Sequence, residues 1–338
     1  MKHLLLLFFL IIPSGCNQDL NLNLTQNHDQ TEKIVTQLIS PWSIDYDGEN
    51  FFISEKAGMI VKVGQDGKLI REDVHLSAPL SNAAESGLLG FVLDKGFQDS
   101  QKAYAYYTYD FEGAPVNRIV TLEYDGSSWY ENEILLDGIE SGPVHHGGRL
   151  AFSPDNVLYA TIGDGADPDS AQNPKSFNGK IIRLTEENVF EIVSSGHRNP
   201  QGLAWDENGK LYASEHGQSA NDELNIIVEG KNYGWPIIEG TESEDGLETP
   251  LLTSGSNETW APSGMVFHKG LLYIAALRGE GILVIDPHSG EVVDKIEGFG
   301  RIRDVFSDGK SLYFITNNTD GRGKPSDEDD VLYRLTSS

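Results

Sequence analysis

The sequence contains one cysteine, Cys16, among 338 residues. A chain with a single thiol cannot form an internal disulfide bond, so its fold depends on a hydrophobic core. Basic residues are also scarce, since 25 Lys and Arg face 52 Asp and Glu and give a formal charge of −27. Such a charge repels nucleic acid and anionic membrane surfaces, and we exclude both as direct binding partners. A cluster of arginines is therefore unexpected in so acidic a chain and would be informative about function.

The sequence offers no apolar run at its start that is long enough to span a bilayer, because the run at residues 4–12 is too short. This run follows Lys2 and precedes small residues and Cys16, an order typical of a targeting segment. It resembles a bacterial lipoprotein signal, with Pro13 where an aliphatic residue is usual. The alternative is an ordinary secretory signal with an incidental cysteine.

Three segments follow from this interpretation. Residues 1–16 are expected to be a lipoprotein-type signal peptide, with Cys16 as the lipidated residue. The polar, Asn/Gln-rich residues 17–35 are expected to form a flexible tether, and residues 36–338 the folded domain. The protein would then be exported and anchored only by its lipid to a bacterial membrane, facing the periplasm or the cell surface.

One pattern recurs in the folded domain: a short strand, an Asp/Asn/Gly turn, and a second strand that begins with an aromatic residue. Six aromatic residues mark the copies: Phe52, Tyr104, Tyr159, Tyr212, Tyr273 and Tyr313. Their spacing of roughly 40 to 60 residues is the length of one four-stranded propeller blade. The repeat predicts an all-β fold, a six-bladed β-propeller, in preference to a β-sandwich.

The hairpin within "SGPVHHGGRLAFSPDNVLYATIGDGADP", residues 141–168, carries a histidine and an aspartate at its open end. Cross-strand partners in a hairpin have nearly constant index sums, so a turn centred near Asp155 places His145 opposite Asp164. A carboxylate that holds one imidazole nitrogen fixes the tautomer of a general base. The alternative is a loop histidine capped by a nearby aspartate.

Residues just before and just after each hairpin should gather at one mouth of the propeller, around its axis. Those with functional side chains are Glu85, His145, Asp164, Arg198, Asn199, His216, Thr259, Trp260, Arg278, Arg301 and Arg303. Any one of these arginines alone could be a structural ion-pair partner. Four of them at one mouth predict a site for a small polyanion, because guanidinium groups bind carboxylates through paired hydrogen bonds.

Four motifs, "HHGGRLAFSPDNVLYATIGD", "GHRNPQGLAWDENGKLYASEHG", "DELNIIVEGKNYGWP" and "RIRDV", closely resemble the pyrroloquinoline-quinone (PQQ)-dependent glucose/sorbosone dehydrogenases, the soluble aldose sugar dehydrogenases of bacteria. The resemblance extends from about residue 38 to the C-terminus. It implies a six-bladed propeller, a quinone cofactor with three carboxylates, and Ca²⁺.

The resemblance also implies roles for individual residues. His145, and not His146, matches the catalytic base, Asp164 matches the carboxylate that orients it, and Arg198 matches the residue beside the reactive quinone carbonyl. The cofactor-binding set that it implies is Glu85, His145, Arg198, Asn199, His216, Thr259, Arg278, Arg301 and Arg303. Glu85 stands where relatives often have glutamine.

Two calcium sites are implied in the same way. The backbone carbonyls of Gly217 and Gln218 match the loop that binds the calcium in contact with the quinone. Asp222, Glu223 and Tyr233 lie in a region that binds additional structural calcium in some relatives. An ordinary solvated loop is the alternative for these last three residues.

The implied activity is oxidation of an aldose at its anomeric carbon to a lactone, with electrons passed to a periplasmic or artificial acceptor. Two other classes remain open from the sequence. One is a calcium-dependent propeller hydrolase of the lactonase kind, which would direct carboxylate and Asn side chains at a central ion. The other is a non-enzymatic propeller that binds a carbohydrate or a protein partner.

Overall fold

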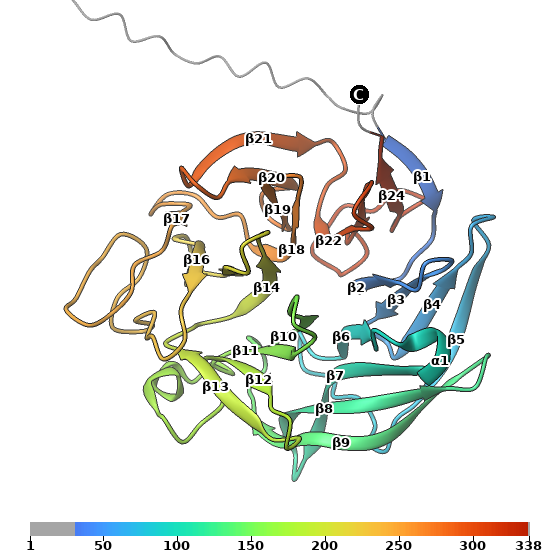
Figure 1. Cartoon of the computed structure of the whole chain (residues 1–338), viewed down its shortest axis with the longest axis horizontal. Coiled ribbons are helices and arrows are strands. Elements are labelled where there is room, and N and C mark those ends of the chain that lie inside the picture. The colour runs from blue at the N-terminus through green and yellow to red at the C-terminus, as the bar shows by residue number, and fades with distance from the viewer. Residues whose placement is uncertain (1–30, 337–338) are drawn as a thin grey trace, which may run out of the picture.

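The computed structural model describes residues 31–336, so Cys16 and the expected signal peptide lie outside the described residues. The regular secondary structure of the described chain is almost entirely β, with one short helix, α1 (Phe97–Ser100), and one 3-10 helix, η2 (Pro168–Gln172). Its strands form four four-stranded sheets and one eight-stranded sheet. Figure 1 shows these sheets arranged around a common centre, which confirms the expected all-β, propeller-like fold. Between residues 31 and 336, no helix has the length and apolarity needed to cross a membrane.

Three of the four-stranded sheets follow the order of the chain. The first contains β10 (Gly147–Phe152), β11 (Leu158–Ile162), β12 (Lys180–Leu184) and β13 (Phe190–Ser195). The second contains β14 (Pro200–Trp205), β15 (Leu211–Glu215), β16 (Glu223–Ile227) and β17 (Leu252–Thr253). The third contains β18 (Pro262–His268), β19 (Leu271–Ala276), β20 (Gly281–Asp286) and β21 (Glu291–Glu297).

The eight-stranded sheet has the order β2-β3-β4-β5-β9-β8-β7-β6. One half contains β2 (Pro41–Tyr46), β3 (Phe51–Glu55), β4 (Met59–Val63) and β5 (Leu69–His75). The other contains β6 (Leu88–Leu93), β7 (Lys102–Phe111), β8 (Ala114–Tyr124) and β9 (Trp129–Glu140). A short parallel pairing of β5 with β9, with Val74 opposite Trp129 and His75 opposite Tyr130, joins the halves.

The fourth four-stranded sheet joins the two ends of the described chain. It contains β1 (Thr31–Val35), β24 (Leu332–Leu335), β23 (Leu312–Thr316) and β22 (Ile302–Ser307). Thr31 lies opposite Leu335 in the antiparallel β1–β24 pair. The expected tether over residues 17–35 is therefore wrong from Thr31 onward. Nothing local marked this strand, because its partner, β24, lies at the other end of the sequence.

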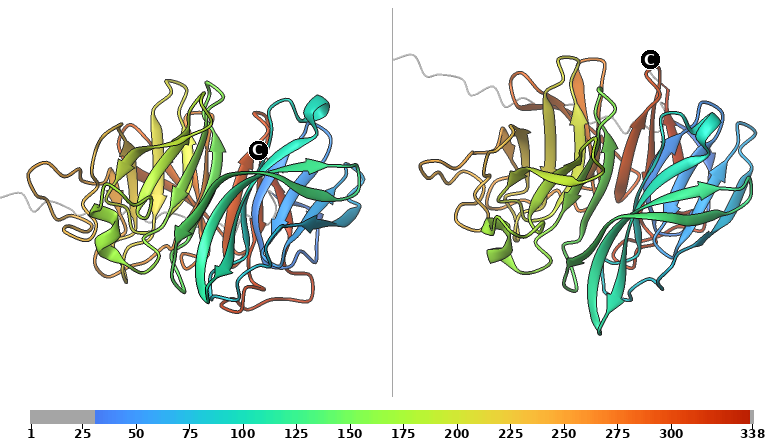
Figure 2. Two further views of the ribbon diagram at one scale, coloured as in Figure 1. Left: turned by 90° about the horizontal axis from the view of Figure 1, so that it is seen from below. Right: turned by 60° about the horizontal axis from the view of Figure 1, so that its bottom comes forward.

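Six strands surround the centre of the molecule, and each packs against the next. These are β2, β6, β10, β14, β18 and β22, and β22 packs in turn against β2. The aromatic residues of the sequence repeat all lie on the neighbouring strands, at Phe52, Tyr104, Tyr159, Tyr212, Tyr273 and Tyr313. Residues from the loops before five of these strands, all but β2, line a single cavity, so these strands start at the same end of the molecule. Figure 2 shows the sheets from two other sides.

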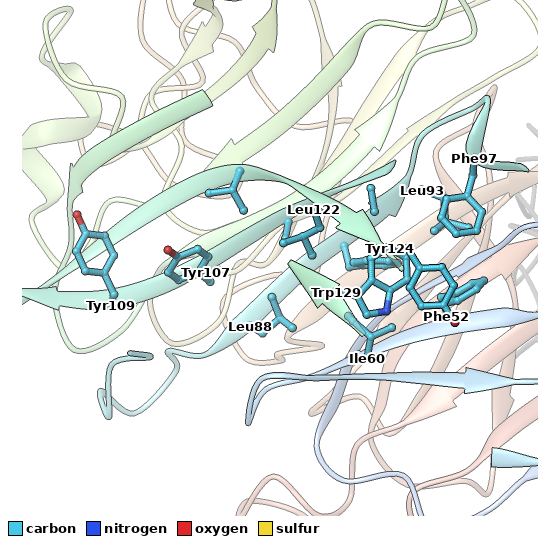
Figure 3. Close-up of a cluster of buried hydrophobic side chains, with 14 of the residues drawn as sticks. Phe52, Ile60, Leu88, Leu93, Phe97, Tyr107, Tyr109, Leu122, Tyr124 and Trp129 are labelled. Carbon is cyan, nitrogen blue, oxygen red and sulfur yellow. The ribbon is translucent and has the colours of Figure 1, made fainter. Parts of the chain in front are cut away.

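Buried side chains between the sheets hold the inner strands in place. The two halves of the eight-stranded sheet share a cluster around Trp129, which is fully buried (Figure 3). The indole packs edge-on against Phe52 and stacks on Tyr124 at a centroid distance of 4.5 Å. Its Nε1 donates to Glu72 Oε2 at 2.9 Å, so the one polar atom of the ring is satisfied.

Candidate active site

The inner strands share an irregularity at the end where the expected site residues lie. Each inner hairpin shows a register shift within the first residues of its inner strand, between Pro41 and Ser43, Leu88 and Phe91, Gly147 and Leu150, Pro200 and Gly202, Pro262 and Met265, and Ile302 and Asp304. An extra residue in one strand bends it and changes the direction of its side chains. The repeated shift therefore helps to aim the residues around this mouth.

A cavity of about 530 Å³ opens at this mouth. Eleven of the residues expected there line it: Glu85, His145, Arg198, Asn199, His216, Gly217, Gln218, Asp222, Thr259, Arg278 and Arg301. Asp164 lies behind His145, while Arg303, Glu223 and Tyr233 are not part of the lining. The structure therefore brings together side chains that are spread over more than 200 residues of sequence.

His145 and Asp164 meet as the hairpin register predicted. Gly147 pairs with Ile162, so the two residues follow in register, and His145 Nδ1 lies 2.7 Å from Asp164 Oδ1. Asp164 is fully buried, whereas the His145 side chain is 18% exposed and reaches the cavity. An ionised carboxylate can only accept a hydrogen bond, so the imidazole donates from Nδ1. The expectation of a cross-strand pair is confirmed.

Arg198 faces the other nitrogen of the same imidazole. Its Nη2 lies 3.0 Å from His145 Nε2, and a guanidinium can only donate. Nε2 therefore carries a lone pair, which is the state required of a proton acceptor. The guanidinium also lies over the ring of Trp235, 5.3 Å from its centroid, which fixes its plane.

Asp164 is held by donors on both oxygens. Oδ1 also accepts from the backbone N–H of Ala166 at 2.8 Å, and Oδ2 accepts from Trp235 Nε1 at 2.9 Å. Trp235 lies in the "NYGWP" motif, but the sequence did not predict its contact with Asp164. The indole thus fixes both the carboxylate and the guanidinium on the two sides of His145.

Replacing Asp164 with asparagine is expected to lower kcat by about 10- to 100-fold, the range for a residue that orients a catalytic group. Every hydrogen-bond partner of the carboxylate is a donor. The NH₂ group of the asparagine must therefore face a donor in either orientation: Trp235 in one, His145 and Ala166 in the other. Trp235→Phe removes one donor to the carboxylate and keeps a ring under Arg198, so it should lower kcat less than Asp164→Asn does. Steady-state kinetics of both variants measures the two losses, and an unchanged kcat in Asp164→Asn would contradict the orienting role.

The arginines of the cavity differ in one position from those expected. Arg198, Arg278 and Arg301 line it, as predicted, and Arg322 is a fourth. Arg303 is buried below, where its Nη1 donates to Gln201 Oε1 at 3.1 Å, and burial lowers its pKa to about 10. The direct cofactor contact expected of Arg303 therefore has no support in this geometry, because bulges in the inner strands change which residues face the mouth.

Arg322 was not among the expected site residues, although its place in the sequence repeat indicates the mouth. It follows β23 at the closing end of its hairpin, as Arg278 follows β19. Asp320, in the same loop, accepts from Arg301 Nη2 at 2.8 Å and was also missed.

Three buried donor or acceptor atoms at the cavity wall have no hydrogen-bond partner within residues 31–336. They are Nε of Arg198, Nε2 of His216 and Nε of Arg301. Burial also lowers the pKa of His216 to about 4, so this imidazole is neutral near pH 7. Buried polar atoms normally have partners, so such a group of unpaired atoms indicates a place where a polar ligand binds.

The loop expected to bind calcium beside the cofactor lies at the cavity wall. The N–H of Gly217 donates to Asp222 Oδ1 at 2.9 Å, and that of Gln218 donates to Glu239 Oε1 at 2.6 Å. Asp222 Oδ2 accepts from the hydroxyl of Thr259 at 2.8 Å and from the N–H of Ala261 at 2.9 Å. Because both oxygens of Asp222 hold backbone or hydroxyl donors, its geometry favours a structural role over the expected metal role.

Glu223 and Tyr233 lie behind the wall, in a small separate pocket that Glu215 and Glu239 also line. Burial and the nearby Glu215 raise the pKa of Glu223 to about 8. The phenolic oxygen of Tyr233 accepts from the N–H of Val228 at 2.9 Å. Within the described residues, no group of three or more His, Cys, Asp or Glu side chains is arranged to hold a metal ion.

A larger cavity, about 740 Å³, opens at the opposite end of the inner strands. Its lining cations are Lys95 and Arg149, against five aspartates: Asp45, Asp47, Asp94, Asp99 and Asp304. Such a wall disfavours an anion, and no histidine lines it. The smaller, arginine-lined cavity is therefore the candidate active site.

Comparisons with known proteins identify the family of this chain and similar dehydrogenases. Residues 38–333 match the family model described as glucose/sorbosone dehydrogenase. The PQQ-bound aldose sugar dehydrogenase of Streptomyces coelicolor superimposes with a TM-score of 0.83 at 35% identity, over 90% of this chain and 96% of that one. An aldose sugar dehydrogenase of Escherichia coli is 28% identical over 86% of this chain and 90% of its own length. The quinoprotein glucose dehydrogenase B of Acinetobacter calcoaceticus is 28% identical over 70% of this chain and 58% of its own length.

Proposed function

The chain belongs to the glucose/sorbosone dehydrogenase family, and from this premise we propose that it oxidises aldose sugars at the anomeric carbon with PQQ as cofactor. The product is a lactone, and the electrons pass to an external acceptor. The observation that carries the proposal is the neutral imidazole of His145, held by Asp164 and Arg198 at the wall of an arginine-lined cavity. A lactonase or a simple binding protein needs no such arrangement of base and guanidinium groups.

The residues of the cavity fit a planar molecule with several carboxylates. Arg278 and Arg301 supply cationic groups, and the unpaired atoms of Arg198, His216 and Arg301 supply polar atoms for ligand oxygens. When bound, PQQ supplies the acceptor for the hydride from the sugar, which no side chain can replace.

The protein's own part in the reaction is to move a proton and to organise charge. His145 Nε2 accepts the proton of the anomeric hydroxyl, and the buried Asp164 carboxylate stabilises the resulting imidazolium. For this transfer Arg198 must first release its hydrogen bond to Nε2, which frees its guanidinium to stabilise negative charge nearby. Trp235 keeps both groups in place through the contacts described above.

The central test uses the purified protein without cofactor. We expect oxidation of aldoses with a dye acceptor only after PQQ and Ca²⁺ are added, and a lactone as the product. Lactone hydrolysis without any quinone would instead identify a hydrolase. Sugar binding with no turnover under any of these conditions would identify a binding protein.

The blade count belongs to the same proposal. If the eight-stranded sheet is divided at its parallel β5–β9 pairing, every group has four strands, which supports six blades. The closed order of the inner strands from β2 to β22 supports the same count.

Calcium is a proposal that rests on the loop at Gly217 and Gln218. The N–H groups of both residues are engaged with carboxylates, and both residues line the cavity, so their carbonyls remain available to an ion. Glu223 and Tyr233 are proposed for a second, structural ion in the small pocket with Glu215.

Arg301 and Arg303 are expected to respond differently to substitution. Arg301→Ala should weaken PQQ binding by about 1.5–3 kcal/mol, the scale of a charge-assisted hydrogen bond, because Arg301 lines the cavity. Arg303→Ala should mainly lower the free energy of unfolding, because its guanidinium is buried against Gln201. Calorimetric titration and thermal unfolding of both variants measure the two quantities. An equal loss of affinity in both would place Arg303 in direct contact with the cofactor.

We also propose that the protein is exported and lipid-anchored at Cys16. Cells that express it should incorporate a fatty-acid analogue into the wild type but not into Cys16→Ser, because the thiol is the attachment point. Gel fluorescence of the labelled protein gives the result. Recovery of unlabelled wild-type protein with a different cleavage site would contradict the anchor.

A further inference from the structure

Glu85 is one of three acids, with Asp222 and Glu280, in the wall of the cavity that four arginines line. Its Oε2 accepts the backbone N–H of His145 at 3.0 Å, and its Oε1 accepts from Arg322 Nη1 at 3.1 Å. The side chain is 24% exposed, so solvent screens it only in part. Glu85 therefore contacts the backbone of the catalytic base and the guanidinium of Arg322 at the same time.

The bond to His145 matters because this residue has an unusual backbone. Its φ of 64° lies in the left-handed region, which costs free energy for a residue with a side chain. The Glu85 carboxylate binds the N–H of that residue, while the carbonyl of His145 accepts from the N–H of Gly165 at 3.2 Å. Glu85 thus helps to hold the backbone that directs the imidazole toward Asp164.

This bond has an electrostatic cost. Burial raises the pKa of Glu85, but the hydrogen bond from the backbone of His145, the neighbouring His216 and the guanidinium of Arg322 outweigh burial and lower this pKa to about 2, so the carboxylate stays ionised. A fixed negative charge in the wall repels an anionic ligand. Within the described residues, Arg322 is the one cationic side chain that hydrogen-bonds Glu85.

Arg322 is anchored although its side chain is 55% exposed. Its backbone N–H donates to Asp320 Oδ1 at 2.9 Å, and the other oxygen of Asp320 accepts from Arg301 at 2.8 Å. The loop after β23 is therefore tied to the cavity wall through Arg301 and reaches the segment before β6 through Glu85.

We propose that Arg322 is a positioning residue that neutralises Glu85 in the cofactor cavity. With Arg322 in place, Glu85 can hold the backbone of His145 without weakening the binding of an anionic cofactor. This inference rests on the proposed function, because it takes PQQ as the anion.

A double-mutant cycle tests the pair through cofactor binding rather than turnover. PQQ is titrated into apo-protein of the wild type, Glu85→Gln, Arg322→Ala and the double variant, with tryptophan fluorescence as the signal. Arg322→Ala should weaken binding about tenfold when Glu85 is present, because the carboxylate that faces the anion then loses the cation hydrogen-bonded to it. The same substitution in the Glu85→Gln variant should cost less than about threefold, since no charge needs compensation there.

Raised ionic strength should shrink the tenfold effect, because salt screens the repulsion. Arg334→Ala is the matched control: this arginine pairs with Glu32 on the outer strands, is 40% exposed, and lies outside the cavity. It should leave PQQ affinity unchanged. Thermal unfolding of every variant verifies the fold.

The failure of this inference and the failure of the proposed function would give different results. Equal losses from Arg322→Ala in the wild type and in the Glu85→Gln variant would overturn the neutralising role while leaving the proposed function intact. Absence of PQQ binding by the wild type would overturn the proposed function, and this inference with it.

Discussion

His145→Ala is expected to lower kcat by about 10² to 10⁴, the usual contribution of a positioned general base. The expectation rests on one atom, Nε2, which carries the lone pair because Asp164 fixes the proton on Nδ1. PQQ affinity should change far less than kcat, since the imidazole is one of many contacts. Turnover at saturating PQQ and sugar, together with a cofactor titration, separates these two effects.

His146→Ala is the neighbouring control. The His146 side chain is buried, its Nδ1 lies 2.8 Å from Ser141 Oγ, and it does not line the cavity. It should keep most of the activity at a temperature where the variant is folded. Equal losses at both positions, or full activity in His145→Ala, would remove His145 as the base and favour a binding propeller.

Arg198→Ala should lower kcat by about 10² to 10³, the cost of losing one preorganised donor at a site of developing charge. Two contacts of Arg198 support an effect of this magnitude on kcat. The guanidinium is fixed on the face of Trp235, and its Nη2 reaches the nitrogen that receives the proton. Because Trp235 holds the plane of the guanidinium, only the hydrogen bond from Nη2 to Nε2 has to be released when charge develops.

Arg198→Lys is the informative comparison, because it keeps the charge and removes the planar fork. We expect it to recover only part of kcat, with PQQ affinity close to that of the wild type. Full recovery in Arg198→Lys would show that charge alone is required. Unchanged turnover in Arg198→Ala would remove the residue from the reaction altogether.

The pair at the open end of the β10–β11 hairpin could be predicted because it is local. The turn fixes the register over some 20 residues, and the register fixes which side chains face each other. His145 and Asp164 therefore meet as expected, and the repeated aromatic residues place the second strand of every inner hairpin for the same reason.

Contacts between distant segments could not be predicted in this way. The sequence repeat indicated a ring of blades but not that β1 and β24 complete the same sheet, because these two strands lie at opposite ends of the described chain. The repeat also grouped Arg301 with Arg303. The register of the β22–β23 pairing shifts between Ile302 and Asp304, a feature of how the two strands pair and not of either sequence alone. In the structure Arg303 is buried below the cavity that Arg301 lines.

The sequence by itself determined the all-β repeat, the mouth that holds the candidate site and the pairing of His145 with Asp164, because each depends on strand period and turn register. Only the tertiary structure decided which charges compensate one another there. Trp235 holds Asp164 and Arg198 together, and Arg322 reaches Glu85 across 237 positions of the chain. Such pairings depend on how loops from different sheets converge at the axis, and the local pattern of the sequence carries no information about that convergence.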